Sequence, residues 1–380
     1  MTMPIKTIQH TPLTAHIPVI KVIGLGGAGS NTVNRMIELG LTGIDYIAAN
    51  TDAQALKSCL APVKIQLGPR STRGLGAGGN PQVGQEAAEE SLRDLSAVLE
   101  GADMVFLTAG MGGGTGTGSI PIVARIARSL GALTIAIVSL PFSFEMGRRQ
   151  QNARQGLAKL REYTDTLITI PNDRLLKIAP PNLTLDLAFR LADDIMRQGI
   201  QGITEIITQT GLINVDFGHV RQLMQMGGGS LLSIGYGEGA SKATHAVDKA
   251  LHHPLLESIP LDQSSGVIAN FTGGCDLTFQ EVAEALSHLQ EIAGNQASII
   301  PGVMSDDRME GRVQVILVIT GLGATPLEPA SIQTKSPEPS KVVLQDSMPI
   351  RRPIIETAMV EASGNLTDLD IPAFMRRRIR

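Results

Sequence analysis

Two glycine-rich segments constrain the fold of this chain more than any other feature of its sequence. Residues 24–31 read GLGGAGSN and follow a short apolar run, and residues 110–118 read GMGGGTGTG. Glycine weakens regular structure, so glycines at this density indicate tight turns or a backbone that closely approaches a ligand. Backbone N–H groups in such loops bind phosphate oxygens, above all where the loop opens a helix. The two segments therefore predict two phosphate-binding loops in an α/β domain.

The first segment has alternative interpretations when it is taken alone. It contains the pattern G-x-G-x-x-G, which is also typical of dinucleotide-binding enzymes, and Asp45 or Asp52 lies near the position of their ribose-binding acid. It could also be a strand–helix turn without a ligand. A dinucleotide enzyme needs one such loop, whereas two loops in one sheet suit a triphosphate. The pattern G-x-x-x-x-G-K-[ST] is absent from the sequence, which excludes the usual P-loop nucleotidase.

Apolar periodicity predicts an α/β architecture around these loops. Between residues 18 and 171, short β-branched runs alternate with helix-period segments, as in a parallel sheet covered by helices on both faces. We expect a helix over residues 120–130, where Ile122, Ile126 and Leu130 recur at intervals of four. The expected strands are residues 20–24, 45–49, 103–108, 133–139 and 166–170.

A long helix and a smaller α/β unit are expected in the second half of the chain. Residues 184–210 carry apolar side chains on one row of a helix that would be about 40 Å long, enough to connect two domains. The row consists of Leu187, Leu191, Ile195, Ile203 and Ile207. Beyond it we expect strands at 230–236, 267–271 and 312–320 and helices at 240–251 and 278–292.

The composition changes after residue 323. Six prolines fall between Pro326 and Pro353 among few apolar residues, which predicts a disordered linker. Residues 366–380 regain apolar side chains and end in arginines, as in a partner-docking peptide. We divide the chain into an N-terminal extension (1–17), a nucleotide-binding domain (18–183), a core helix (184–210), a C-terminal domain (211–323), a linker (324–365) and a docking tail (366–380).

Charge and composition exclude several classes of protein. The net charge is −4 and tryptophan is absent, so a surface that coats nucleic acid is not expected. Cys59 and Cys275 are too few for a disulfide framework or a four-cysteine zinc site. The start of the chain is unlike a signal peptide, and no apolar run approaches the ~20 residues of a membrane span. We expect a soluble cytoplasmic protein.

The chain resembles the tubulin/FtsZ family. Residues 112–118 read GGGTGTG, the signature of that family, and residues 20–31 are similar to the first loop of FtsZ. The resemblance extends over residues 20–323 and the last dozen. It implies a parallel-sheet GTP-binding domain, a long core helix and a smaller α/β C-terminal domain. It also implies a GTPase that polymerises head to tail into filaments of the cell-division ring. Further matching segments are residues 50–52, 74–81, 141–145, 170–173, 214–217 and 369–374.

The resemblance also implies residues that bind GTP or GDP with Mg²⁺. Those implied to hold the α- and β-phosphates are Gly27, Ala28, Gly29, Ser30, Asn31, Gly114, Thr115 and Gly116. Those implied to sense the γ-phosphate are Ala77, Gly78 and Gly79. Asn50 and Asp52 would lie near the phosphates and Mg²⁺. The ribose side is assigned to Glu145 and Arg149, and the base to Asn172, Phe189 and Asp193.

Asp193 has the chemistry to select guanine. A carboxylate accepts two charge-assisted hydrogen bonds from the N–H groups on one guanine edge, a pair that adenine lacks. The competing interpretations are structural: Asp193 as a solvated helix acid, Phe189 as core, and Glu145 with Arg149 as a surface ion pair.

The group that activates water is implied to come from a neighbouring subunit, through the loop at residues 212–220. Asn214, Asp216 and His219 are the catalytic candidates in this loop. A site completed by the next copy is heterologous, so it propagates into a filament. FtsZ proteins carry a second acid where this chain has His219. Imidazole can accept a proton, but imidazolium would repel Mg²⁺. His219 could therefore be a tolerated exchange, or the chain could be a GTP-binding scaffold with little hydrolysis.

Partners and location follow from the same resemblance. We expect self-association into filaments, and docking of membrane-tethering and regulatory division proteins on residues 368–380. Attraction of the terminal arginines to anionic lipid is the competing interpretation of the tail. The resemblance places the protein at the mid-cell division site beneath the membrane.

Overall fold

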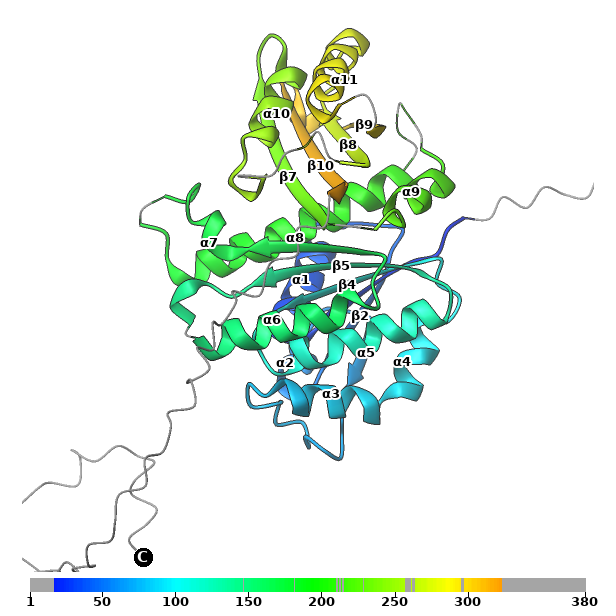
Figure 1. Cartoon of the computed structure of the whole chain (residues 1–380), viewed down its shortest axis with the longest axis vertical. Coiled ribbons are helices and arrows are strands. Elements are labelled where there is room, and N and C mark those ends of the chain that lie inside the picture. Colours follow the sequence, from blue (N-terminus) through cyan, green and yellow to red (C-terminus); the bar gives the residue numbers. More distant parts are fainter. Residues whose placement is uncertain are drawn as a thin grey trace, which may run out of the picture. The chain divides into compact units, whose positions relative to one another are not determined.

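A ten-stranded sheet runs through the described part of the chain, in the order β3-β2-β1-β4-β5-β6-β7-β10-β8-β9. Figure 1 shows β2, β4 and β5 in one half of it and β7, β8, β9 and β10 in the other. The computed structural model describes residues 17–145, 147–180, 182–209, 211, 213, 215–227, 229–256, 261, 264–294 and 297–322. Almost all of the predicted extension, the linker and the tail lie outside these residues. No helix within the described ranges is long and apolar enough to cross a membrane.

Six parallel strands form the first half of the sheet. They are β1 (Ile20–Leu25), β2 (Asp45–Asn50), β3 (Val63–Gln66), β4 (Met104–Gly110), β5 (Leu133–Leu140) and β6 (Thr166–Pro171). The five strands expected from the sequence are confirmed. β3 was missed because it spans only four residues, of which Val63 and Lys64 are exposed.

Helices cover both faces of this parallel sheet, as predicted. Alternate residues point to opposite faces, so Ile20 and Val22 join one core while Ile23 and Leu25 join the other. The first face carries α1 (Gly26–Glu38), α2 (Ala53–Ser58), α8 (Leu185–Thr208) and α9 (Phe217–Met224). The second face carries α3 (Pro81–Glu90), α4 (Leu92–Leu99), α5 (Thr115–Ser129) and α6 (Gly147–Arg161). The helix predicted over residues 120–130 is α5, which begins five residues earlier, and Leu130 is partly exposed instead of buried.

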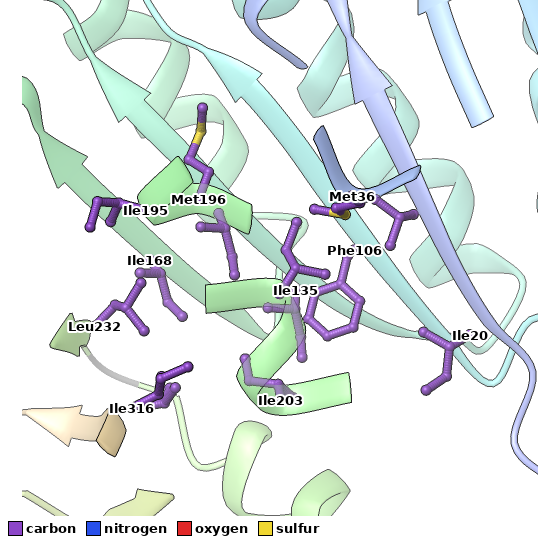
Figure 2. Packing of buried hydrophobic residues seen from close by; sticks show 14 of the residues in the cluster. Ile20, Met36, Phe106, Ile135, Ile168, Ile195, Met196, Ile203, Leu232 and Ile316 are labelled. Carbon is purple, nitrogen blue, oxygen red and sulfur yellow. The ribbon is translucent and has the colours of Figure 1, made fainter. Parts of the chain in front are cut away.

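Helix α8 is the long helix expected from the sequence. It begins after Thr184, whose hydroxyl accepts a hydrogen bond from the Leu187 N–H, and its 24 residues span about 36 Å. The core that buries it is continuous between the two halves of the sheet: Phe106 lies at one side of α8, and Leu232 and Ile316 at the other (Figure 2). Leu187, expected in the buried row, is half exposed.

Four strands form the second half of the sheet, called here the C-terminal sheet. They are β7 (Gly229–Glu238), β8 (Gly266–Gly273), β9 (Ser298–Ser305) and β10 (Arg312–Leu322). β10 is antiparallel to β7 and β8, whereas β8 and β9 are parallel. Helices α10 (Lys242–Leu251) and α11 (Phe279–Ala293) share a core with this sheet. Edge strand β9 was missed because Pro301 interrupts its pattern, and proline is tolerated at a sheet edge.

Candidate functional site

The two glycine-rich loops meet at the carboxyl ends of neighbouring parallel strands. The first follows β1 and opens α1, and the second follows β4 and opens α5. Gly26 has a φ of +70°, and a Cβ built on it would lie 3.0 Å from the Gly116 backbone nitrogen. A side chain at Gly26 would therefore separate the loops. The N-termini of α1 and α5, each of which attracts negative charge, lie side by side here.

A cavity of about 300 Å³ opens beside these loops. The predicted site residues that line it are Gly27, Ala28, Gly114, Thr115, Gly116, Glu145, Arg149, Asn172, Phe189 and Asp193. These residues come from α1, α5, α6, α7 (Asn172–Leu175), α8 and the segment after β5. The fold thus gathers the phosphate loops and the proposed base-reading residues around one space.

Two buried side-chain atoms at the site have no hydrogen-bond partner among the described residues. They are the Ser30 Oγ, in the first turns of α1, and the Asn172 Oδ1, at the start of α7. Buried polar atoms are normally paired, because leaving one unpaired costs about 1–3 kcal/mol. Asn172 lines the cavity, so its unpaired oxygen fits a site that a polar ligand completes, whereas Ser30 is outside the cavity lining.

Asp193 is partly buried, and its carboxyl group has a raised pKa. Burial raises its pKa to about 7; the side-chain hydrogen bond with Asn31 opposes that rise, and the nearby Asp194 carboxylate adds to it. This hydrogen bond links α8 to the first glycine loop. A carboxylate that is poorly solvated in the empty protein gains most from a ligand that donates hydrogen bonds to it.

Phe189 lines the cavity and belongs to a small group of packed aromatic rings. The Phe189 ring packs edge-on against Phe142 with centroids 5.4 Å apart, and Phe142 stacks on Phe144 at 5.1 Å. Glu145 accepts a hydrogen bond from the Phe142 N–H at 2.9 Å and pairs with Arg149. The predicted surface pair thus exists, but both of its members also line the cavity. Phe189 is 38% exposed, so it is not a plain core residue.

The third glycine-rich segment packs on the second. A Cβ at Gly114 would lie 2.8 Å from the Ala77 Cβ. The Asn152 amide donates to the Gly112 carbonyl at 3.2 Å and to the Gly79 carbonyl at 3.4 Å, which ties both loops to α6. Ala77, Gly78 and Gly79 are outside the cavity lining but belong to the segment adjoining it. Asn152 was missed, because nothing in the sequence distinguishes it from other polar helix residues.

Asn50 and Asp52 lie at the end of β2, beside the second loop. The Asn50 Oδ1 accepts the Asp52 N–H at 3.2 Å, and the intervening Thr51 hydroxyl lies 2.6 Å from the Thr115 hydroxyl. Asp52 caps α2, with its Oδ1 accepting the Gln54 and Ala55 N–H groups. No group of three or more metal-ligating His, Cys, Asp or Glu residues occurs in the ranges that the structure describes. Asn50 and Asp52 thus place oxygen atoms, the ligands that Mg²⁺ prefers, beside the second loop.

The catalytic candidates lie away from this cavity. Asp216 caps α9, accepting the Gly218 N–H at 3.3 Å, and His219 lies in the first turn of that helix. Asn214 lies outside the described residues. Asp216 and His219 line a second cavity of about 330 Å³, which shares no lining residue with the first. The structure thus does not bring these candidates to the glycine loops within one chain. The second cavity is lined by Ile213, Val215, Asp216, His219, Gln222, Leu223, Met226 and residues 298–301.

Comparisons with known proteins agree with this arrangement. The GTPase domain of the Tubulin/FtsZ family matches residues 19–180, and the C-terminal domain of the FtsZ family matches residues 228–323. An empty FtsZ dimer from M. jannaschii is 46% identical with a TM-score of 0.76, over 80% of this chain and 88% of that chain. A mutant form of M. jannaschii FtsZ is 45% identical with a TM-score of 0.78, over 80% of this chain and 91% of that one.

A more distant protein shares the fold alone. CetZ2 from Haloferax volcanii, solved as a GTPγS-bound protofilament, is 19% identical with a TM-score of 0.67. The match covers 80% of this chain and 94% of that chain.

Proposed function

The chain belongs to the FtsZ family of polymerising, tubulin-like cell-division GTPases, and we propose that its glycine-lined cavity binds GTP and GDP. One observation carries this proposal: two glycine loops line the same space as Asn172, whose buried Oδ1 has no hydrogen-bond partner among the described residues. Backbone N–H groups of the loops bind the α- and β-phosphates, and the Thr115 hydroxyl donates to them. Ala77, Gly78 and Gly79 contact the γ-phosphate.

Asn172 and Asp193 read the guanine in this proposal, and Phe189 packs on its face. Asp193 binds as a carboxylate, because only the ionised group accepts both N–H bonds from guanine. Glu145 and Arg149 hold the ribose side. The raised pKa of Asp193 supports the assignment, since an empty site that desolvates the carboxylate is completed by a hydrogen-bond donor.

Mg²⁺ fits the donor set beside β2. Asp52 has one carboxylate oxygen engaged in capping α2, which leaves the other to hold the ion together with Asn50. When bound, Mg²⁺ neutralises charge on the phosphate oxygens. Asp52 and Asn50 would hold the ion next to the second glycine loop.

We assign hydrolysis to a site completed by a second copy. Asp216, with Asn214 and His219, orients the attacking water on the nucleotide of the neighbouring subunit. The separation of the two cavities within one chain supports this assignment, because Asp216 and the glycine loops line different cavities. Such head-to-tail contact propagates into a filament and makes hydrolysis depend on assembly. One relative of this chain was solved as an FtsZ dimer.

A GTP-binding scaffold with little hydrolysis is the second candidate function. His219 favours it, because one acid of the family pattern is missing from the loop. In both candidates residues 368–380 dock membrane-tethering and regulatory division proteins, which brings the filament to the mid-cell division site.

Phosphate release at rising protein concentration tests the proposal. The activity per subunit is expected to appear only above a critical concentration and with GTP, not ATP, because each site needs a partner's loop. A rate per subunit that is independent of concentration would contradict a shared site. Filaments that form with GTP but release almost no phosphate would favour the scaffold.

A further inference from the structure

The loop that joins α8 to α9 lies along the free edge of the C-terminal sheet. Ile213 forms an isolated antiparallel β-bridge with Val303 of β9. β9 is the last strand of the sheet, and its other edge pairs with β8. The loop thus covers part of an edge that would otherwise present unpaired backbone groups.

Gly211 brings the loop backbone unusually close to β9. A Cβ built on Gly211 would lie 2.6 Å from the Val303 carbonyl oxygen and 2.9 Å from the Met304 Sδ. No residue with a side chain fits there unless the loop or the strand moves. Two residues later, the Ile213 side chain packs on the core that the C-terminal sheet shares with α10 and α11. The loop is therefore held to this sheet by both backbone and side chain.

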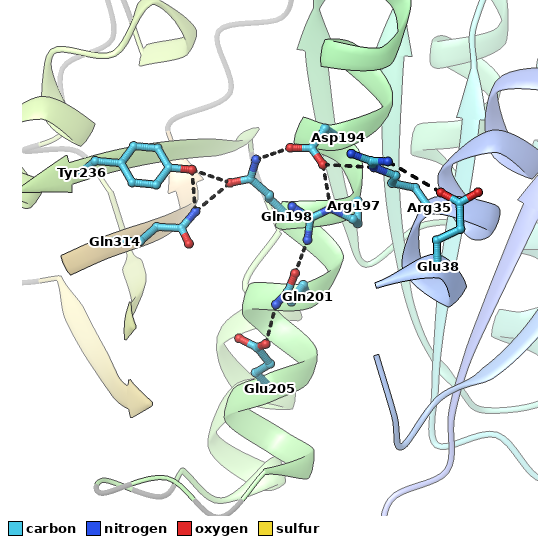
Figure 3. Close-up of polar contacts among 9 residues, drawn as sticks. All are labelled: Arg35, Glu38, Asp194, Arg197, Gln198, Gln201, Glu205, Tyr236 and Gln314. Atoms are coloured by element: carbon cyan, nitrogen blue, oxygen red, sulfur yellow. Dashed lines mark hydrogen bonds and ion pairs between the residues drawn. The ribbon is translucent and has the colours of Figure 1, made fainter. Parts of the chain in front are cut away.

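Helix α8, which leads into the loop, is anchored to the same sheet by polar contacts (Figure 3). The Gln198 Oε1 accepts hydrogen bonds from the Gln314 Nε2 at 2.7 Å and from the Tyr236 hydroxyl at 3.2 Å. Nearer the end of α8, the Asn270 amide of β8 donates to the Gly202 carbonyl at 3.2 Å. The C-terminal sheet therefore holds the helix as well as the loop that follows it.

We infer that edge strand β9 positions the loop between α8 and α9 that leads to Asp216 and His219, called here the hydrolytic loop. Gly211 and Ile213 are the positioning residues. Ile213, Asp216 and His219 line one cavity together with residues 298–301 of β9, so the strand forms part of the wall of the cavity that holds these side chains. This inference rests on the proposed role of Asp216 in hydrolysis. It gives the C-terminal sheet a function in the reaction, although the sheet contributes no residue to the nucleotide cavity.

If the inference holds, changes at Gly211 or Ile213 lower the rate of GTP hydrolysis without changing nucleotide affinity. A displacement of about 1 Å in a catalytic group can lower a rate about 100-fold. The nucleotide cavity contains no residue of this loop or of β9, so GDP affinity is expected to remain unchanged. A role that is merely structural would instead lower stability and leave the rate of the folded, assembled protein intact.

The experiment compares Ile213→Ala, Ile213→Val and Gly211→Ala in the full-length protein. GTP turnover is measured per assembled subunit, with the polymer quantified by sedimentation, and GDP affinity is measured by calorimetry. A variant that does not assemble alone is measured in copolymers over a range of variant-to-parent ratios, where turnover per assembled subunit is expected to fall in proportion to the variant's share. We expect turnover to fall roughly 10- to 100-fold for Ile213→Ala and Gly211→Ala. Ile213→Val, which keeps a β-branched side chain that can pack on the same core, is expected to stay within about threefold of the parent.

Leu286→Ala is the matched control, because Leu286 is a half-buried residue of the same core on α11, away from the loop. It is expected to lower thermal stability about as much as Ile213→Ala while retaining parental turnover. Parental turnover in both Ile213→Ala and Gly211→Ala, or an equal loss in Leu286→Ala, would overturn the inference. Asp216→Ala tests the proposed function separately. If this variant also retains parental turnover, the role of Asp216 in hydrolysis is wrong, and not only the role of β9 in positioning it.

Discussion

Binding of guanine nucleotide is expected to weaken as the pH falls from 8 to 6, because Asp193 must be ionised to accept the guanine N–H groups. Burial raises the pKa of Asp193 to about 7, and Asp194 and Asn31 are the charged and polar neighbours that modify it. With that pKa, the ionised fraction falls from about 90% at pH 8 to about 10% at pH 6. Since only the carboxylate binds, affinity is expected to fall about tenfold over this range.

The raised pKa of Asp193 also makes the free energy of unfolding depend on pH. The folded, empty protein holds the Asp193 proton up to about pH 7, whereas the unfolded chain releases it near pH 4. The folded state binds more protons in this window, so the free energy of unfolding decreases as the pH rises from 4 to 7. The total is on the order of 4 kcal/mol for a shift of about three units. Asp193→Asn is therefore expected to stabilise the empty protein at pH 8.

Calorimetry with GDP measures the effect without hydrolysis. Titrations in two buffers of different ionisation enthalpy count the protons released on binding, which are expected to approach one per site at pH 6 for Asp193. The nucleotide phosphates also titrate in this range, so the comparison is with Asp193→Asn, in which only the phosphate protons remain. Equal proton release by parent and variant, or equal GDP affinity at pH 6 and pH 8, would refute the reasoning.

Four further predictions concern the phosphate loops, the hydrolytic loop, the tail and the core. Thr115→Ala is expected to weaken GDP binding by about tenfold or more, since a hydrogen bond to a charged group is lost, and Thr115→Ser is the control in calorimetry. His219→Asp is expected to raise turnover per assembled subunit by up to ~100-fold with GDP affinity unchanged; equal rates would make His219 a bystander. Deletion of residues 366–380 is expected to leave assembly intact and abolish recruitment to the division site, and a truncated protein that still localises there would contradict the docking role. Phe106→Ala, at a fully buried position, is expected to cost about 3–5 kcal/mol in denaturant unfolding, with exposed Phe144→Ala as the control.

The strands and the positions of the two glycine-rich loops could be predicted because their signals are local. Strands such as Leu133–Leu140 are buried on both faces of a parallel sheet, and an unbroken run of apolar residues indicates that burial. The glycines of the two loops likewise carry their own signal, because a backbone that must approach phosphate excludes side chains. Strands β3 and β9 escaped prediction because one is short and partly exposed and the other contains Pro301.

The pairing of distant residues escaped prediction for a different reason. Asn152 joins two glycine loops, and Ile213 bridges to Val303, but neither residue differs in type from many others in the chain. Their roles arise from contact between segments that are far apart in sequence. Periodicity reports which face of an element is buried, and it does not report which other element covers that face.

The sequence by itself determined the α/β class, the two glycine-rich loops, and the identities of Asp193 and Asp216 as acids with candidate roles. Only the tertiary structure decided that Asp193 is desolvated beside Asn31, that the cavities of Asp193 and Asp216 are separate, and that the loop carrying Asp216 is held by β9. The physical reason is the range of the interactions. Backbone preference and apolar periodicity act between near neighbours in the chain, whereas desolvation and side-chain contact depend on where the completed fold brings distant residues together.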